Sequence, residues 1–229
     1  MIQINFPHLD QPIELVKGKC NVLVVENNPI YSKVIYSIYN HQDEYFKIFD
    51  ENNKLLKAKE IVTIFHPLAF DFNEKSIKTL FYNRIINQIN MEVEEKQSLE
   101  NNFRSLVNQL VELVDENNNL DVAYNDDLDF KNFFKSIDLS INQTIQSSIF
   151  EKIQLIINIL DELAAEKLLI FTNLNIFLSN QEYLYMMEQI NLNNQTVLII
   201  ESSRYTLENI PYYYLDTDFF LDESMVKLD

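Results

Sequence analysis

Glycine, cysteine and tryptophan are nearly absent from this chain. Its 229 residues include one glycine, Gly18, one cysteine, Cys20, and no tryptophan. A Walker A loop requires two glycines and a dinucleotide-binding fingerprint requires three, so the chain has neither phosphate-binding loop. A single cysteine excludes an internal disulfide and a cysteine-based zinc site. The turns must therefore use asparagine and aspartate, which tolerate left-handed backbone better than other non-glycine residues.

Long apolar runs are also missing. No run approaches the roughly 18 residues of a membrane span. The first ten residues, MIQINFPHLD, lack the basic region and apolar region of a secretion signal. Hydrophobic residues make up 47% of the chain and charged residues 23%, which are values typical of a globular protein. We therefore expect a cytoplasmic protein without a membrane partner.

Basic residues are scarce relative to acidic ones. The chain has 18 lysines and arginines against 35 aspartates and glutamates, a formal net charge of −17. A negative surface repels phosphate, and binding to nucleic acid depends on lysine and arginine. Any role in binding DNA therefore requires basic side chains that are separated from the acidic ones.

Three short apolar runs, at 22–25, 168–171 and 197–200, predict strands buried on both faces. Each run is followed by a helical pattern, which favours an α/β fold with a mainly parallel sheet. Two further pairs of short strands are expected, one within residues 2–15 and one formed by 46–49 with 55–59.

About a hundred residues between the early predicted strands and the run at 168–171 look helical. We predict a head domain formed by 1–66 and 167–229, with a helical lobe, 67–166, inserted into it. Apolar side chains recur at helical spacing in three stretches of this lobe, led by Ile77, Leu99 and Ile149. The first helix should begin near Asn73 as its cap and pair antiparallel with the second. Their apolar stripes indicate a core or a coiled-coil seam, or else a contact between subunits.

The segment from Ser105 to Phe130 contains seven acidic residues and no lysine or arginine. Oxygen ligands at this density suit a hard cation such as calcium. The match to an EF-hand loop is poor, because Leu120 stands where that loop needs glycine and Asp126 where it needs glutamate. A solvated acidic loop is the alternative interpretation.

Basic residues come in small groups outside that acidic segment. Lys131 and Lys135 lie one helical turn apart, and a second group is Lys54, Lys57 and Lys59. Exposed lysines on solvated helix faces are the ordinary interpretation, but their position leaves a role in contacting phosphates open. No nucleophile, base or phosphate loop can be identified that would support catalysis, so we do not expect an enzyme.

Several stretches, in this order and at this spacing, resemble the second Csn family of type II-A CRISPR adaptation proteins. They are LDQPI (9–13), FD (49–50), AFDFN (69–73), IFEK (149–152), KLLIF (167–171), EQINLNN (188–194) and YLD (214–216). The similarity extends over essentially the whole chain, and it lies in the ordered set rather than in any single motif.

This resemblance implies a head related to P-loop kinase-like folds, without the Walker A loop, and an elongated helical lobe. Members of the family form ring-shaped homotetramers, bind calcium and thread the ends of linear double-stranded DNA through the ring. They act in spacer acquisition, with the CRISPR integrase pair and the type II effector nuclease as partners.

The resemblance carries over to individual residues only in part. Lys135-Ser136 matches a pair that relatives place toward DNA, whereas Ser140 replaces a second lysine. In the acidic segment Leu120-Asp121 matches, but Ala123 and Asn125 replace carboxylates found in relatives. The calcium ligands expected here are Asp121, Asp126, Asp127 and Asp129.

The sequence thus supports the hypothesis of a non-catalytic ring that binds DNA ends without reading their sequence, in a calcium-dependent manner. Its DNA-contacting residues would be Lys131, Lys135, Lys54, Lys57 and Lys59. One alternative is a protein-interaction scaffold built on a degenerate NTPase-like fold. Another is an active nucleotide phosphotransferase, which the lack of glycine disfavours.

Overall fold

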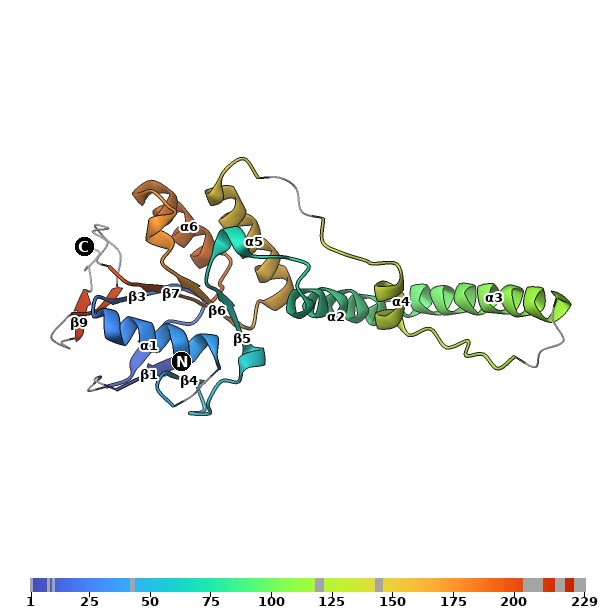
Figure 1. The fold of residues 1–229 in the computed structure, drawn as a ribbon, viewed down its shortest axis with the longest axis horizontal. Helices are drawn as coiled ribbons and strands as arrows, with labels where there is room; N and C mark the ends of the chain where they lie inside the picture. The colour runs from blue at the N-terminus through green and yellow to red at the C-terminus, as the bar shows by residue number, and fades with distance from the viewer. Residues whose placement is uncertain are drawn as a thin grey trace. The chain divides into compact units, whose positions relative to one another are not determined.

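The computed structural model describes residues 2–7, 9, 11–41, 44–117, 122–142, 146–203, 212–216 and 221–224. The chain divides into two compact units (Figure 1). We call residues 1–70 with 145–229 the head, and residues 71–144 the lobe. The predicted insertion, 67–166, differs from this division, because helix α5 (Ile149–Ala164) belongs to the head.

The three apolar runs form the centre of the main sheet of the head, as predicted. They are β3 (Cys20–Val25), β6 (Leu168–Thr172) and β7 (Val197–Glu201), and every residue in them is buried. With β5 (Ile61–Ile64) and β8 (Tyr212–Leu215) they make five parallel strands, in the order β5-β6-β7-β3-β8. The antiparallel β9 (Leu221–Ser224) follows at the edge. The predicted α/β fold with a mainly parallel sheet is therefore confirmed.

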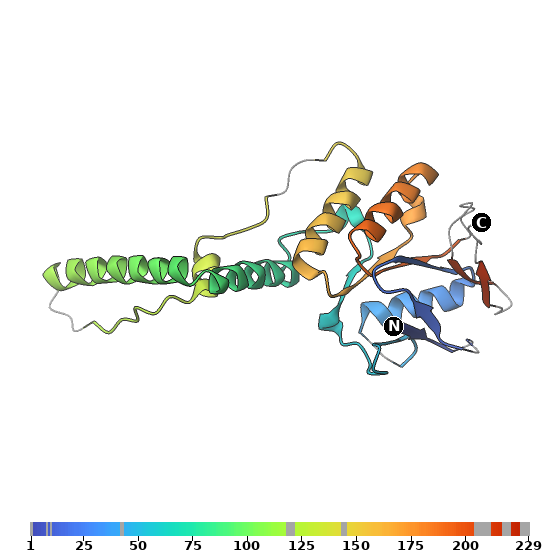
Figure 2. The same ribbon diagram turned by 180° about the vertical axis from the view of Figure 1, so that it is seen from behind.

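Helices cover both faces of this sheet (Figure 1). Alternate strand residues such as Leu23 and Ile200 face α1 (Asn28–Tyr39), whose Val34 is fully buried in the same cluster. The opposite face is covered by α5 and α6 (Asn180–Leu192), as the view from behind also shows (Figure 2). Because strand residues are apolar on both sides, the sheet can be buried from both sides.

A second sheet in the head is small and antiparallel, with the order β2-β1-β4. Its strands are β1 (Ile2–Asn5), β2 (Ile13–Leu15) and β4 (Lys47–Phe49). The predicted pairing within residues 2–15 is confirmed. The predicted pairing of 46–49 with 55–59 is confirmed only in part: one antiparallel bridge joins Phe49 to Leu55, and the Leu56 N–H donates to the Ile48 carbonyl at 2.8 Å, but the strand partner of β4 is β1. The chain there forms the short helix η1 (Ala58–Glu60) instead.

The amphipathic helix α5 explains why the head extends beyond its predicted limit. Ile153, Ile156 and Leu160 of this helix are completely buried. They lie on one stripe, and the helix contacts both α6 and the short helix η2 (Pro67–Ala69). An apolar stripe along a helix predicts that one face is buried, but it does not show whether the partner is another helix or a sheet. Periodicity alone could therefore not assign α5 to the head.

In the lobe, α2 (Lys75–Met91) and α3 (Val93–Asn117) run end to end rather than antiparallel (Figures 1 and 2). The predicted antiparallel pair is therefore wrong. A single residue, Glu92, separates the two helices, and one residue is too short a connection to reverse the chain. After α3 the chain returns through the extended residues 122–129 to the short helix α4 (Phe130–Ser136).

None of the described helices is long and apolar enough to cross a membrane.

The scarcity of glycine has the predicted effect on the turns. Among the described residues, five other than glycine have left-handed backbone, and four of them are asparagine or aspartate: Asn53, Asp138, Asn173 and Asn194. The fifth is His41. Short polar side chains thus take the positions at which most proteins use glycine.

Candidate nucleic-acid interface and cation site

Helix α4 carries the two lysines predicted to contact DNA. Its Phe134 is buried and packs against the ring of Tyr82 in α2, with the ring centroids 5.6 Å apart. Lys131 and Lys135 lie one turn apart on a different face of the helix, and both are exposed. The aromatic contact therefore fixes α4 on α2 and leaves both lysines exposed to solvent, where the Lys135 ammonium donates to the Asn132 side-chain oxygen at 3.4 Å.

Both ends of α4 are capped. At the beginning, the Asp129 carboxylate accepts hydrogen bonds from the Asn132 backbone N–H at 3.0 Å and from its side-chain amide at 2.8 Å. At the end, Asp138 adopts left-handed backbone with φ 46°, and the Leu139 N–H donates to the Phe134 carbonyl at 2.9 Å. Caps of this kind stabilise a helix that has only seven residues.

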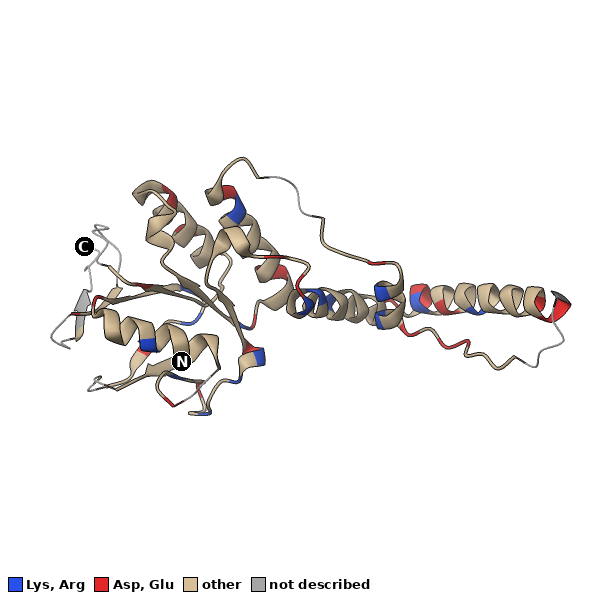
Figure 3. Ribbon diagram, in the orientation of Figure 1, with Lys and Arg blue, Asp and Glu red and all other residues tan. Residues whose placement is uncertain are grey.

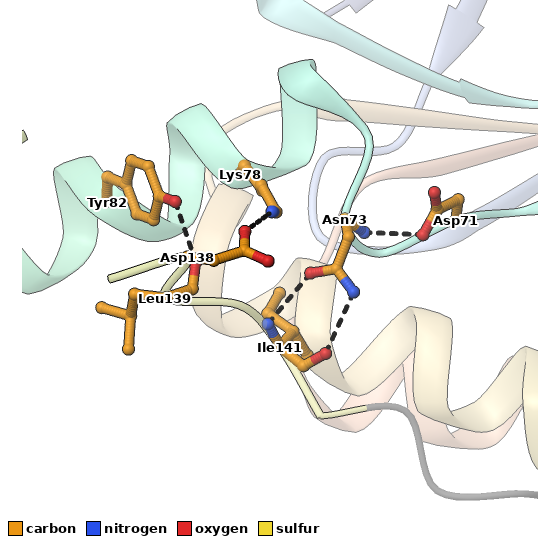
Figure 4. A network of polar contacts seen from close by, with 7 residues as sticks. All are labelled: Asp71, Asn73, Lys78, Tyr82, Asp138, Leu139 and Ile141. Carbon is orange, nitrogen blue, oxygen red and sulfur yellow. Dashed lines mark hydrogen bonds and ion pairs between the residues drawn. The ribbon is translucent and has the colours of Figure 1, made fainter. Parts of the chain in front are cut away.

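A network of polar contacts ties the residues after α4 to the beginning of α2 (Figure 4). The Lys78 ammonium lies 2.9 Å from the Asp138 carboxylate, and the Tyr82 hydroxyl donates to the Leu139 carbonyl at 2.8 Å. This contact with Asp138 raises the pKa of Lys78. Lys78 is therefore engaged within the lobe.

Asn73 joins the same network instead of capping α2 (Figure 4). Its side-chain amide donates to the Ile141 carbonyl at 3.2 Å and accepts from the Ile141 N–H at 3.0 Å. The predicted cap at Asn73 is thus wrong, since Glu74 occupies the cap position of α2. The side-chain amide of Asn73 thus donates to and accepts from the backbone of one residue, as a neighbouring β-strand would. This pair of hydrogen bonds joins the beginning of the lobe to its end.

The acidic residues of the return segment are paired with Arg104 of α3. The Arg104 guanidinium lies 3.4 Å from the Asp126 carboxylate and 3.7 Å from that of Asp127. No local sequence pattern signals this contact, because Arg104 belongs to no motif and lies on a helix that is distant in sequence from Asp126 and Asp127. Exposed ion pairs like these contribute about 0–1 kcal/mol each.

The described carboxylates do not assemble into a cation site. Asp126 and Asp127 face Arg104, and Asp129 caps α4. Asp121 lies outside the described residues. Across the part of the chain that the structure describes, no group of three or more His, Cys, Asp or Glu side chains is placed to hold a metal ion. Their oxygen atoms suit calcium chemically, but these three residues do not converge on one point.

Lys54, Lys57 and Lys59 belong to the head, not to the unit that carries Lys131 and Lys135. All three are exposed, in the turn after β4 and in η1. Local contacts order this backbone, because Asp50 accepts from the Lys54 N–H and Glu60 from the Lys57 N–H, each at 2.8 Å. The hydrogen bond from Lys54 is the largest cause of the lowered pKa of Asp50.

The charges of the lobe alternate along the chain (Figure 3). Basic residues lie on α2 and α4. Acidic residues occupy both the beginning and the far end of α3, and they recur in residues 122–129. Lys131 and Lys135 are thus outside the acidic segment, as the sequence indicates, although Asp129 and Asp138 flank their helix closely.

Helix α3 exposes an apolar stripe that the lobe leaves largely uncovered. Leu99, Leu106, Leu110 and Leu113 are 44–57% exposed. Together with Phe103 they follow the alternating spacing of four and three residues that defines a coiled-coil seam. A contiguous apolar stripe of this kind marks an interaction surface.

The carboxyl edge of the head sheet lacks a phosphate loop. Glu26 and Asn27 follow β3, and Asn27 caps α1 by accepting from the Ile30 N–H at 3.2 Å. The Glu26 carboxylate accepts a hydrogen bond from the Tyr214 hydroxyl. Where a nucleotide-binding protein presents glycine N–H groups, this chain presents a carboxylate and an asparagine.

These features define a class of protein: an α/β head without a phosphate loop that carries an inserted helical lobe with exposed lysines. Comparison with known proteins agrees over nearly the whole chain. The family described as CRISPR-associated protein (Cas_Csn2) matches residues 19–219. The CRISPR-associated protein Csn2 of Streptococcus agalactiae is 34% identical over 228 residues, 99% of this chain and 100% of the relative.

The Csn2 protein of Enterococcus faecalis is 30% identical over 96% of this chain and 98% of its own length. The chain therefore belongs to the Csn2 family of CRISPR-associated proteins, whose part in defence is CRISPR adaptation. Among solved structures, Stu0660 of Streptococcus thermophilus matches with a TM-score of 0.57 and 15% identity, over 97% of this chain and 75% of that one. That likeness concerns the fold alone.

Proposed function

We propose that this protein binds the ends of double-stranded DNA, without catalysis, as a homotetrameric ring during spacer acquisition. Family membership along the full length supports a role in adaptation. The observation that carries the DNA-binding proposal is α4, which presents Lys131 and Lys135 side by side on a helix fixed at both ends. Ammonium groups presented in this way suit a row of phosphates.

The proposed mode of binding is electrostatic and independent of base sequence. Lysine contacts to phosphate carry no sequence information, and they position the protein on the duplex. Since the chain carries a net charge of −17, such lysines must face the DNA while the acidic surface faces away. Lys54, Lys57 and Lys59 of the head are proposed as further phosphate contacts on the same grounds.

Self-association is proposed to use the exposed stripe of α3. Burying leucines that are half exposed in one chain against a second copy would contribute about 25 cal/mol for each Å² removed from water. Opposing this, four chains bring together 4 × 17 = 68 formal negative charges. Bound cations would relieve that repulsion, which is why calcium is part of the proposal. The relation of the head to P-loop kinase-like folds is proposed from the resemblance and from the parallel sheet.

A protein-interaction scaffold is the second candidate function, and the same stripe favours it. In that case α3 would receive a helix from a protein of the adaptation machinery, such as the integrase pair or the effector nuclease, rather than a second copy. DNA binding would then be incidental. The two candidate functions differ in whether the purified protein assembles with itself and binds linear DNA without another protein.

Native mass measurement with linear and closed-circular duplexes tests the proposal. We expect a tetramer in calcium buffer that binds a linear duplex and fails to bind the same duplex closed into a circle, because threading needs an end. Chelation of calcium should weaken both assembly and binding. A monomer that ignores free duplex ends would contradict the ring and favour the scaffold. A tetramer unaffected by chelation would contradict only the role of calcium.

A further inference from the structure

The carboxyl edge of the head sheet contains a buried acid that no proposed role uses. Glu201 is the last residue of β7, lies opposite Val24 of β3, and is 1% exposed. The four residues before it in the strand are apolar and completely buried. A glutamate is almost never buried to this extent unless it is paired, because burial disfavours its charged form.

The hydrogen bonds of Glu201 satisfy only one of its two oxygens. Oε1 accepts from the Tyr183 hydroxyl of α6 at 3.1 Å and from the Asn175 N–H at 3.2 Å. Asn175 lies in the short helix η3 (Leu174–Ile176). Oε2 is buried and has no hydrogen-bond partner among the described residues. An ionised carboxylate can accept about four hydrogen bonds, so ionisation of Glu201 would leave a buried, charged Oε2 without a donor.

Other titratable groups near Glu201 are neutral. Tyr31 of α1 is the titratable group whose pKa Glu201 affects most directly, because burial followed by the charge of Glu201 raises the pKa of Tyr31 to about 12. Cys20 lies at the other end of β3, opposite Val197, and burial is the main cause that raises the pKa of its thiol. No lysine or arginine of the described chain forms an ion pair with it. Desolvation is accordingly the main cause that raises the pKa of Glu201 to about 7, while hydrogen bonds from the Tyr183 hydroxyl and from the backbone N–H groups of Asn175 and Leu174 oppose the shift.

We infer that Glu201 is a protonation switch for the junction between β7, η3 and α6. The neutral carboxyl keeps the junction closed, and ionisation loosens it because a buried charge with one unpaired oxygen favours exposure to water. The effect extends to the residues after β7. There the Asn173 side chain accepts from the Ser202 N–H at 2.9 Å, and the Asn175 amide donates to the Ser203 hydroxyl at 3.1 Å.

The direction of the pH effect follows from linkage. Opening exposes Glu201 and returns its pKa toward the ordinary value of 4.5, whereas the closed junction holds the pKa near 7. Between these two values the closed state binds more protons, so its stability relative to the open state falls as pH rises. Below about pH 4.5 both states are protonated, and above about 7 both are ionised, so the dependence ends there.

Hydrogen exchange of the full chain between pH 5 and 8, corrected for intrinsic rates, tests this inference. The protection of the Asn175 and Ser202 amides should fall by up to about tenfold per pH unit below pH 7 and level off above it. Glu201→Gln removes the titration and should give a flat profile. Tyr183→Phe removes a donor to the carboxylate and should move the levelling-off to higher pH. Glu188→Gln, at an exposed site of α6, should behave as the wild type.

A second measurement does not depend on any variant. The side-chain carboxyl ¹³C shift of Glu201 in the wild-type protein should titrate near neutral pH, well above exposed glutamates. A titration in the ordinary glutamate range would overturn the inference, even if Glu201→Gln failed to fold. So would a Glu201→Gln profile that keeps the wild-type pH dependence. Neither result would bear on DNA binding or assembly.

Discussion

Gly18 is the one glycine of the chain, and its position requires glycine. Its φ is +72°, and its N–H donates to the Thr196 hydroxyl at 2.8 Å just before β3 begins. A Cβ built on Gly18 would lie 1.9 Å from the Asn194 side-chain oxygen and 3.2 Å from the Asn194 carbonyl oxygen. Both the backbone conformation and the available space therefore make a side chain at this position energetically costly.

Gly18→Ala should lower the free energy of unfolding by about 1–3 kcal/mol, because left-handed backbone costs alanine energy and Asn194 must move. Chemical denaturation measures this loss. Adding Asn194→Gly should recover only the part caused by the side-chain clash, since glycine tolerates the left-handed φ of 56° at position 194 while the backbone strain at position 18 remains. A fully stable Gly18→Ala variant would show that this turn can change its conformation freely.

Single residues were also where the sequence was least informative about the candidate site. Asn73 has the chemistry of a helix cap, but its amide instead pairs with the backbone of Ile141, 68 residues away. Arg104 carries no motif, yet it lies against two of the predicted calcium ligands. Contacts between residues so far apart in the sequence depend on the path of the chain after α3, which runs back along the helices of the lobe. Local sequence patterns do not predict that path.

At the scale of elements, hydrophobic patterns predicted the strands better than the arrangement of the helices. An unbroken apolar run such as 168–171 is explained only by burial on both faces, so β6 was predictable. An apolar stripe on a helix predicts that this face packs against another surface, but it does not identify that surface. The apolar stripe of α5 is buried in the head, whereas the apolar stripe of α3 is exposed and does not pack against α2.

The stripe of α3 leads to a prediction about assembly. Leu106→Glu with Leu113→Glu should leave the monomer folded, because both leucines are more than half exposed, at 53% and 57%. The same change should abolish the oligomer, since charged side chains would face the apolar seam of the partner helix. Light scattering after size-exclusion chromatography measures the mass.

The matched control is Asn101→Glu with Asn108→Glu. These residues are also seven apart on α3 and exposed, but they lie on the opposite side of the helix from the leucines. They add the same charge and should leave the oligomer intact. If the control dissociates as readily as the leucine variant, repulsion rather than loss of the seam is responsible, and α3 is not the interface.

At the scale of the whole molecule, the central question is how a chain with a net charge of −17 could hold DNA. The proposed answer is separation: exposed lysines lie on the capped helix α4, while Asp126 and Asp127 are paired with Arg104 and Asp129 caps the helix. The predicted head lysines lie in a separate unit, so their share in binding must be measured independently.

The most direct measurement is the DNA affinity of Lys131→Ala with Lys135→Ala, across a series of salt concentrations and with two unrelated linear duplexes. Lys17→Ala with Lys19→Ala is the control, because it removes the same charge from exposed positions of the head. The α4 variant should bind both duplexes more weakly to the same degree and with a shallower salt dependence, since each lost phosphate contact lowers the slope by about 0.9. Affinity that is unchanged, or lost equally in the control, would contradict the assignment of α4 as the DNA-contacting helix.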